Sequence, residues 1–390
     1  MISVSEARKH LLALVRQLDS EEVPLAEAAG RVLARDVQAR RDQPPFSASA
    51  MDGYAVNAAE VELHAMFKVI GEAAAGHGYK GRIGAGQAVR IFTGAPVPEG
   101  ASFVVIQEDV TRSGDLITIT DDPGSNSNIR PRGGDFLDGQ TITAPKFLTA
   151  ADVALMAAMN IPAVPVTRRP QIALISTGDE LVMPGGTPGP DQIIASNTFG
   201  LKAMLEELGA RARILPIARD TESSLSMAFE LAEGADLIVT IGGASVGDHD
   251  LVGKVAGDLG MERSFYKVAM RPGKPLMAGR LNGAAMAGLP GNPVSAMVCG
   301  RIFLAPMIQS MLGLPAGDQS RKTAILSEDL SSNGPREHYM RARVEDGSIR
   351  AFPNQDSSLL TVLSDANALL IRPPSDGARK SGEEVQYIRL

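Results

Sequence analysis

From Gln171 to about residue 317, short apolar runs alternate with longer stretches in which apolar residues recur every three or four positions. The runs QIALIST, ARILPIA and DLIVTIGG predict buried strands, because strands of a parallel sheet are covered on both faces. The stretch Phe199–Gly209 and the segment SSLSMAFELAEG predict helices between them. A last helix is expected from Val294 to about Leu312, with Asn292 as N-cap and Pro293 at the first helical position. This alternation is typical of a doubly wound α/β domain.

On both sides of this domain the pattern changes to short runs in which apolar and polar residues alternate. From Tyr54 to about Ile142 such runs are separated by Gly-rich turns, which predicts a small antiparallel β domain. The C-terminal part alternates in the same way, and Asp346–Gly347 between two runs predicts a tight hairpin. We therefore expect a second small β domain at the end of the chain.

The first 43 residues predict mostly short elements. The N-terminal stretch is amphipathic, and Ser3 followed by Glu6 is a capping box, so a helix is expected there and not a signal peptide or a membrane span. A short helix is predicted near Leu25–Ala29 and a strand from Val32 to Val37. Further along, a helix rich in small residues from Asp152 leads into a Pro-punctuated connector before the α/β domain.

Composition narrows the function classes. The 390 residues are 44% hydrophobic and 21% charged, as in soluble multidomain proteins. The net charge of -7 argues against a general surface for nucleic acid or anionic membrane. A single cysteine, Cys299, excludes an intrachain disulfide and suits a reducing cytoplasm, and its position on a predicted helix suggests a buried apolar role.

The candidate chemistry gathers at Gly- and Pro-rich turns that follow or join the predicted strands: STGDEL, IGGASVGDHD, MRPGKP and GLPGNPVSA. Such turns at the carboxyl ends of parallel strands, opening into helices, bring backbone N–H groups onto an anion. The carboxylates of Asp248 and Asp250, with the cations of Lys267, Arg271 and Lys274, suit a phosphorylated or oxyanionic ligand with a divalent metal. The residues that these turns offer to a ligand are Ser176, Thr177, Gly242, Gly243, Ser245, Gly247, Pro290, Asn292 and Pro293.

Each motif taken singly is also compatible with an ordinary surface turn. This holds as well for the first-half turns that carry Asp52, Thr93, Arg130 and Asp135. A Walker-type loop and a dinucleotide-binding GxGxxG after a strand are both missing from the sequence.

The order of the motifs carries more information than any one of them. The segments PPF…SAMDGYAV, IFTGAPVP, NIRPRGGD, STGDEL, GGASVGDHD, RPGKP and GLPGNPVSA stand in the order and spacing of the molybdopterin molybdenumtransferase (MoeA) family, which includes the E domain of gephyrin. The chain resembles this family over nearly its whole length, least after about residue 320.

The resemblance implies an elongated, four-domain homodimer. Its units would be a discontinuous N-terminal domain (1–43 and 140–170), an inserted β domain (44–139), an α/β molybdopterin-binding domain (171–317) and a C-terminal β-barrel-like domain (318–390). The active site would lie in a cleft between the α/β domain of one subunit and the β domains of the other. The implied reaction converts adenylylated molybdopterin and molybdate into molybdenum cofactor and AMP, by cleavage of the pyrophosphate in a Mg²⁺-dependent step.

Motif by motif, the resemblance also implies site residues. Those at catalytic positions are Asp52, Thr93, Arg130, Asp135, Glu180, Asp220, Asp250 and Lys267, with Glu180 and Asp250 as metal ligands. Arg271 also falls on a functional position of the family, and Lys274, Arg341 and either Ser357 or Ser358 fall near the molybdate-binding set. Two positions depart from the common pattern: Ala48 stands where the family commonly has Asn, and Arg271 stands where relatives often have Lys, which preserves the charge.

Other functions stay open at this stage. The preceding enzyme, molybdopterin adenylyltransferase, resembles only the α/β part; the added β domains count against that reading, although a contact between the two enzymes is expected. A non-enzymatic scaffold, like gephyrin at receptor clusters, finds no support in a chain without a second module. Insertion of tungsten is not separable by sequence, because the two oxyanions are nearly isosteric.

Overall fold

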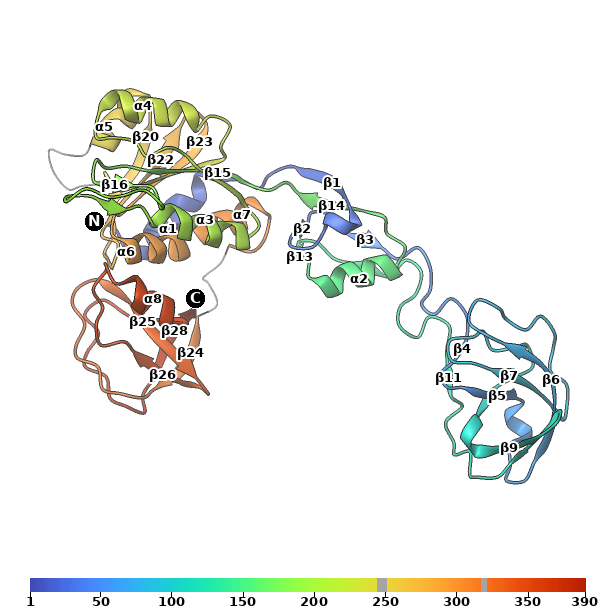
Figure 1. Cartoon of the computed structure of the whole chain (residues 1–390). Coiled ribbons are helices and arrows are strands. Elements are labelled where there is room, and N and C mark those ends of the chain that lie inside the picture. Colours follow the sequence, from blue (N-terminus) through green and yellow to red (C-terminus); the bar gives the residue numbers. More distant parts are fainter. Residues whose placement is uncertain (244–250, 317–320) are drawn as a thin grey trace.

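The computed structural model describes residues 1–243, 251–316 and 321–390. The chain is elongated (Figure 1): an α/β unit and a C-terminal β unit lie together at one end, an N-terminal unit lies in the middle, and a distal β unit lies at the far end. The predicted fold class is therefore confirmed. The exact residue boundaries of the domains stay predictions.

The α/β unit is built on a sheet with the strand order β18-β15-β19-β23-β22-β20. Strands β18 (Arg211–Ile214), β15 (Gln171–Ser176), β19 (Leu237–Ile241) and β23 (Ala284–Leu289) are parallel. Strand β22 (Pro275–Leu281) is antiparallel to both β23 and β20 (Glu262–Lys267). The MRPGKP turn thus follows the carboxyl end of a strand as predicted, but it opens into an antiparallel strand and not into a helix.

Helices cover both faces of this sheet, as a doubly wound fold requires (Figure 1). One face packs against α1 (Val4–Ala13), α3 (Asn197–Glu207) and the continuous run of α6 (Pro293–Cys299), a π-helical turn (Gly300–Leu304) and α7 (Ala305–Met311). The other face packs against α4 (Glu222–Leu231) and α5 (Leu251–Asp258). The run Pro293–Met311 is long and apolar enough to cross a membrane, but 78% of its apolar window is buried as the core helix of this unit.

The helix starts follow the sequence signals. Ser3 and Glu6 form the predicted capping box of α1, which packs into the core of the α/β unit against α7. Asn292 is the N-cap of α6, with Pro293 in the first turn, as expected. Cys299 is fully buried on that helix, and this confirms its predicted apolar role.

The N-terminal unit contains two small sheets and one helix. The first sheet has the order β1-β14-β2-β13, and the second pairs β3 with β12. Their bounds are β1 (Ser20–Pro24), β2 (Val32–Leu33), β3 (Val37–Gln38), β12 (Thr141–Ile142), β13 (Lys146–Phe147) and β14 (Ala163–Thr167), with η1 (Leu25–Glu27) and α2 (Ala150–Ala158). The predicted strand Val32–Val37 is wrong as one element, because its two ends pair with different sheets. The predicted helix near Leu25 is a single 3-10 turn.

The distal β unit contains a sheet with the order β8-β5-β7-β6-β10-β9, and a short β4–β11 pair. The bounds are β4 (Ala48–Ser49), β5 (Gly53–Val56), β6 (Met66–Ala73), β7 (Gln87–Ile91), β8 (Phe103–Ile106), β9 (Val110–Ser113), β10 (Leu116–Ile119) and β11 (Ile129–Arg130), with turns η2 (Ala58–Glu60) and η3 (Gln107–Asp109). The prediction of a purely antiparallel unit is wrong at one pair: β6 and β7 are parallel. Because the two strands are parallel, the Gly-rich segment between them returns the chain to the end at which β6 begins.

The C-terminal β unit is closed by a pairing of β25 with β27. Its elements are β24 (Lys322–Leu326), β25 (Glu337–Glu345), β26 (Ser348–Ala351), α8 (Leu360–Asp365), β27 (Ala368–Arg372) and β28 (Glu384–Arg389). The predicted hairpin joins β25 to β26, with positive φ at both Asp346 and Gly347. Strand β21 (Met270–Arg271) leaves the α/β unit and adds to this sheet beside β25, so the two units share backbone hydrogen bonding.

An ion pair fixes the connector between the N-terminal and α/β units. Both terminal nitrogens of Arg168 donate to the carboxylate of Asp236, at 2.8 and 2.7 Å. Asp236 also accepts a bond of 2.8 Å from the backbone N–H of Gln171, the first residue of β15. A two-pronged pair of this kind sets direction as well as distance, and it therefore orients the entry into the sheet.

We expect Asp236→Ala to lower the free energy of unfolding of the α/β unit by about 2 kcal/mol, because it leaves the guanidinium and the Gln171 N–H without their shared acceptor. Urea unfolding followed by circular dichroism measures the change. Glu99→Ala is the matched control, since it removes the partner of Arg82 from a pair that is 74% exposed on both sides and should cost little. Equal losses in the two variants would contradict an anchoring role for Asp236.

Candidate functional site

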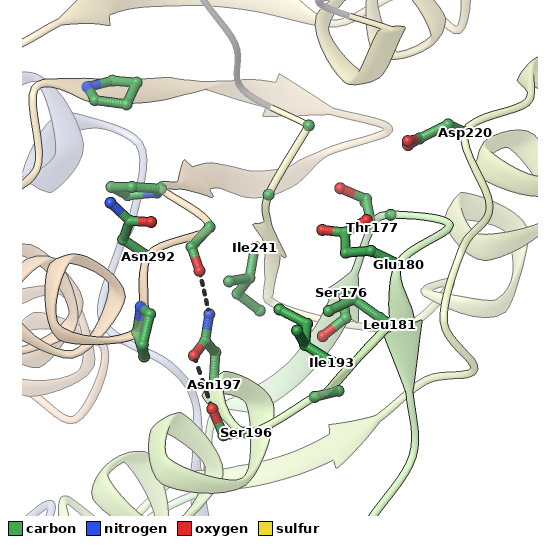
Figure 2. A pocket seen from close by; sticks show the side chains of 18 of the residues that line it. Ser176, Thr177, Glu180, Leu181, Ile193, Ser196, Asn197, Asp220, Ile241 and Asn292 are labelled. Atoms are coloured by element: carbon green, nitrogen blue, oxygen red, sulfur yellow. Dashed lines mark hydrogen bonds between the residues drawn. The ribbon is translucent and has the colours of Figure 1, made fainter. Parts of the chain in front are cut away.

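The candidate site is a pocket of about 980 Å³ at the carboxyl edge of the α/β sheet. Parallel pairing builds this edge: Ser176 of β15 lies opposite Ile241 of β19, and Ile241 lies opposite Leu289 of β23. The residues that follow each strand therefore meet at one place. Of the sequence-predicted residues, the pocket brings together Ser176, Thr177, Glu180, Asp220, Gly242, Gly243, Pro290, Asn292, Pro293 and Ser358 (Figure 2).

The floor of the pocket depends on glycine. Gly242 has φ of +93°, and a Cβ at that position would lie 2.7 Å from the backbone oxygen of Thr177. Only glycine tolerates both the left-handed backbone and this approach. The hydroxyl of Thr177 is buried beside Gly242 and Gly243 and has no hydrogen-bond partner among the described residues. An unpaired buried hydroxyl is costly unless a ligand or water satisfies it, so this atom marks a polar contact point of the pocket.

Two carboxylates project into the same space. Glu180 follows β15 within the STGDEL turn, and Asp220 precedes α4; Figure 2 shows both side chains directed toward the centre of the pocket. Asp220 is positioned through its backbone N–H, which donates to Asp179 at 3.3 Å. Among residues 1–243, 251–316 and 321–390, no group of three or more His, Cys, Asp or Glu side chains is placed to hold a metal ion. The described part of the chain thus contributes two carboxylates to the lining of the pocket.

An apolar wall faces these polar groups, and sequence reasoning missed it. It comes from β16 (Leu181–Val182) and β17 (Ile193–Ile194), which pair in parallel and frame the pocket with Leu181, Ile193 and Ile194. Behind it, the side chain of Asn197 donates to the backbone oxygen of Gly291 at 2.7 Å, which ties α3 to the GNP turn (Figure 2). The isolated pair of isoleucines within a Gly- and Pro-rich segment was the available signal.

The pocket also includes Lys254 of α5, which sequence reasoning missed as well. It is the only cationic side chain among the described residues that line the pocket. Its position one helical turn after Leu251, which also lines the pocket, was the signal that could have revealed it.

The C-terminal β unit of the same chain closes one side of the site. Asn292 donates to the hydroxyl of Ser357 at 2.9 Å, and Ser358 lines the pocket. Arg341 is instead 1% exposed and does not line the pocket; its guanidinium donates to the backbone oxygens of Asn354 and Asp356 and to Gln355. Arg341 therefore holds the loop that carries both serines.

The predicted cations Lys267, Arg271 and Lys274 lie beside the pocket and not in its lining. Arg271 and Lys274 are exposed, whereas Lys267 is half-buried with its ammonium 5.5 Å from the ring centre of Tyr266. The turn between them is fixed by Gly273, where φ is +108° and a Cβ would lie 2.5 Å from the sulfur of Cys299. The neighbouring Pro275 does line the pocket, so the cationic turn adjoins its rim.

A buried histidine, His338, lies near four arginines at the join between the α/β unit and the C-terminal β unit. His338 of β25 is paired in register with Arg271 on one side and Arg372 on the other, and it is 7% exposed. Burial, together with the charges of Arg271, Arg341, Arg336 and Arg372, lowers the pKa of His338 to about 4. His338 is therefore neutral at physiological pH in a strongly cationic environment.

The first-half residues lie far from this pocket, in the distal β unit (Figure 1). Both the backbone N–H and the hydroxyl of Thr93 donate to the carboxylate of Asp52, at 2.7 and 2.8 Å, and these bonds lower the pKa of Asp52. Arg130 pairs in register with Ala48, and Asp135 is anchored through its backbone N–H to Gln43. Arg130 and Asp135 have exposed side chains. The structure therefore forms an Asp52–Thr93 pair but does not bring it to the pocket of the same chain.

Three further predicted residues, Ser245, Gly247 and Asp250, lie outside the described residues, as does Asp248.

Comparison with known proteins covers nearly the whole chain. Residues 2–160 match the MoeA N-terminal region (domain I and II), residues 173–310 match a probable molybdopterin binding domain, and residues 323–390 match the MoeA C-terminal region (domain IV). A molybdopterin molybdenumtransferase from Nostoc sp. is 35% identical and is matched over 100% of this chain and 94% of its own length. One from Haemophilus influenzae is 34% identical over 99% and 98%. The crystal structure of a molybdopterin biosynthesis MoeA protein from Pyrococcus horikosii superposes with a TM-score of 0.83 at 30% identity, over 100% and 99%.

The fold and the pocket thus define a multidomain enzyme of the transferase class with a molybdopterin-binding type of α/β unit. The chain belongs to the MoeA family, the molybdopterin molybdenumtransferases of molybdenum cofactor biosynthesis.

The depressed pKa of His338 predicts acid sensitivity. The unfolded chain, with an ordinary histidine pKa near 6.5, takes up this proton more readily than the folded chain. Stability should therefore fall by up to about 3 kcal/mol as the pH drops from about 6.5 to about 4. His338→Gln should flatten this part of the profile, measured by urea unfolding at several pH values. His77→Gln, in an exposed position of the distal β unit, should leave the slope unchanged. Parallel profiles for the parent and His338→Gln would contradict the assignment.

Proposed function

We propose that this protein inserts molybdenum into adenylylated molybdopterin, using molybdate as co-substrate and releasing AMP and molybdenum cofactor as the pyrophosphate is cleaved. The observation that most supports this is the pocket of about 980 Å³ in the unit that matches a molybdopterin-binding domain. Its volume is at the upper end for small-molecule sites. That size suits a substrate that carries both a pterin and an adenylyl group.

The lining suits the two halves of such a substrate. Leu181, Ile193 and Ile194 offer an apolar surface for a planar ring. Thr177 and the Gly242–Gly243 backbone offer a hydroxyl and close approach for phosphate oxygens. Apolar walls with a few placed polar groups are the usual make-up of a site that binds and orients a small molecule.

The two carboxylates suit Mg²⁺ as the cofactor. Mg²⁺ is usually held by one or two carboxylates together with substrate phosphate oxygens. We assign this role to Glu180 and Asp220, with Asp250 as a further candidate from the sequence. A bound Mg²⁺ supplies Lewis-acid polarisation of the phosphoryl oxygens. Thr177 and the Gly242–Gly243 backbone would hold the phosphate oxygens beside these carboxylates.

A homodimer would complete the site. Asp52, Thr93, Arg130 and Asp135 share one unit that lies far from the pocket of its own chain (Figure 1). A two-fold symmetric pair would let the distal β unit of each subunit reach the pocket of the other. The exposed Arg130 and Asp135, together with the Asp52–Thr93 pair, would then face the ligand across the interface.

Molybdate would bind at the cationic rim. Arg271 and Lys274 are exposed on one short turn next to Pro275 of the pocket. Ser357 and Ser358 approach from the C-terminal β unit on the loop that Arg341 holds. A tetrahedral dianion needs such convergent cations and hydroxyl donors. We further propose a cytoplasmic enzyme that receives its substrate by contact with the adenylyltransferase, which would limit loss of the adenylylated pterin to water.

The proposed reaction and the shared site can be tested together. Incubation with adenylylated molybdopterin and Mg²⁺ should release AMP in a molybdate-dependent manner. Asp52→Asn and Glu180→Gln should each be nearly inactive, because they remove opposite sides of one site. Co-expressed at equal levels, they should regain about one quarter of the parent activity, since half of the random dimers carry one intact site.

Asp52→Asn co-expressed with Thr93→Ala is the matched control, because both changes fall on the same side and no site is left intact. Recovery in this control, or no recovery in the first pair, would exclude a site shared in this way. Absence of AMP release by the parent would exclude the reaction itself.

The molybdate assignment predicts a separate phenotype. Arg271→Ala and Lys274→Ala should each raise the molybdate concentration for half-maximal activity by roughly tenfold to a hundredfold, because each removes a charge-assisted bond of about 1.5–3 kcal/mol. High molybdate should restore turnover, and tungstate and sulfate should compete. Lys322→Ala, which removes an exposed cation from β24, should behave like the parent. Parent-like molybdate dependence in both rim variants would remove the rim from the site.

A further inference from the structure

The described lining of the pocket has more negative than positive side chains, which is unfavourable for an anionic ligand. Among the described lining residues, Glu180 and Asp220 bring negative charge, and Lys254 alone brings positive charge. The arginine and lysines of the nearby rim do not line the pocket. An adenylyl phosphate in this space would therefore find one cation, Lys254, within the described lining.

Lys254 is held away from any ligand by an ion pair. It lies in α5, and its ammonium donates to the carboxylate of Glu222 in α4, the neighbouring helix on the same face of the sheet. The two side chains remain 60% and 59% exposed. Exposed pairs of this kind are weak and exchange readily with other partners.

Glu222 does not depend on the lysine for stabilisation. It lies in the first turn of α4, where Thr221 caps the helix through the backbone N–H of Ser224. The positive end of the helix dipole favours a carboxylate at this position. The ion pair can therefore break without leaving a buried charge unpaired. The long flexible side chain of Lys254 can then bring its ammonium to another oxygen.

We propose that Lys254 binds the phosphate of the adenylyl group and that Glu222 is its resting partner, which the phosphate displaces when the ligand enters. This inference rests on the proposed function, because it takes the ligand to be an adenylyl phosphate. Glu222 acts as an intramolecular competitor of the ligand. The pair thus makes the pocket selective for a phosphorylated ligand over an uncharged nucleoside.

The alternative is a brace that only joins α4 to α5. The two interpretations predict different changes in phosphate affinity when Glu222 is removed. If the pair is a brace, loss of either partner changes stability and leaves ligand affinity the same. If Glu222 competes with the ligand, its removal frees the ammonium and tightens phosphate binding, whereas removal of Lys254 weakens it.

The test uses AMP and adenosine as probes, with the full-length protein and isothermal titration calorimetry. We expect Lys254→Met to weaken AMP roughly tenfold, as for one lost charge-assisted contact, and to leave adenosine unchanged. Glu222→Gln should tighten AMP by about threefold at low salt, and added salt should reduce the gain. In the Lys254→Met background, Glu222→Gln should lose most of this gain.

Lys202→Met and Glu206→Gln are the matched controls. They break a comparable lysine–glutamate pair on α3 of the same unit, outside the pocket lining, and should leave AMP affinity unchanged. Equal AMP affinity in the parent, Lys254→Met and Glu222→Gln would overturn the inference, as would an undiminished gain in the double variant.

The insertion assay separates this inference from the proposed function. If the parent releases AMP from adenylylated molybdopterin while both pocket variants bind AMP like the parent, only the role of Lys254 fails. If the parent neither releases nor binds AMP, both fail.

Discussion

The in-register parallel pairing of β15, β19 and β23 is the constraint on which the rest of the site depends. It brings residues that are distant in the chain, Thr177, Gly242 and Pro290, to one edge of the sheet. The backbone pairing continues just past the strand ends, where Thr177 donates to Ile241 and Gly242 donates to Leu289. The left-handed Gly242 then turns the chain away and leaves the hydroxyl of Thr177 in the pocket. A one-residue slip of any strand would move these groups apart, because successive side chains point to opposite faces.

The elongated shape follows from how the units are joined. The N-terminal unit is built from chain segments on both sides of the distal β unit, so that unit extends from it on two connections (Figure 1). The α/β unit has direct links to its neighbours. Arg168 in the connector forms an ion pair with Asp236, and β21 pairs with β25 of the C-terminal sheet. Some of the predicted site residues are thus fixed around the pocket, and those of the distal β unit lie at a distance from it. The shared site proposed above rests on this separation.

Charge is distributed in layers around the pocket. Carboxylates lie inside it, one ion-paired lysine lies within its lining, and Arg271 and Lys274 lie on the turn beside its rim. Repulsion among the arginines is tolerated because His338 remains neutral between them and Arg341 is satisfied by backbone oxygens. An acidic protein can in this way present a locally basic rim beside a pocket that contains carboxylates.

The sequence by itself determined the local and periodic features: the α/β alternation, the caps of α1 and α6, the Asp346–Gly347 hairpin and the strand-end turns that hold Thr177, Glu180 and Gly242. These depend on contacts between residues close in the chain, so spacing and residue type suffice. The tertiary structure alone decided the parallel β6–β7 pair, the split of the Val32–Val37 strand, the apolar wall of Ile193 and Ile194, and the place of Lys254 in the pocket. Each of these depends on which distant segment packs alongside, and no local pattern encodes that choice. The motifs also predicted that Asp52 and Glu180 belong to different domains, and the fold places the distal β unit far from the α/β unit (Figure 1).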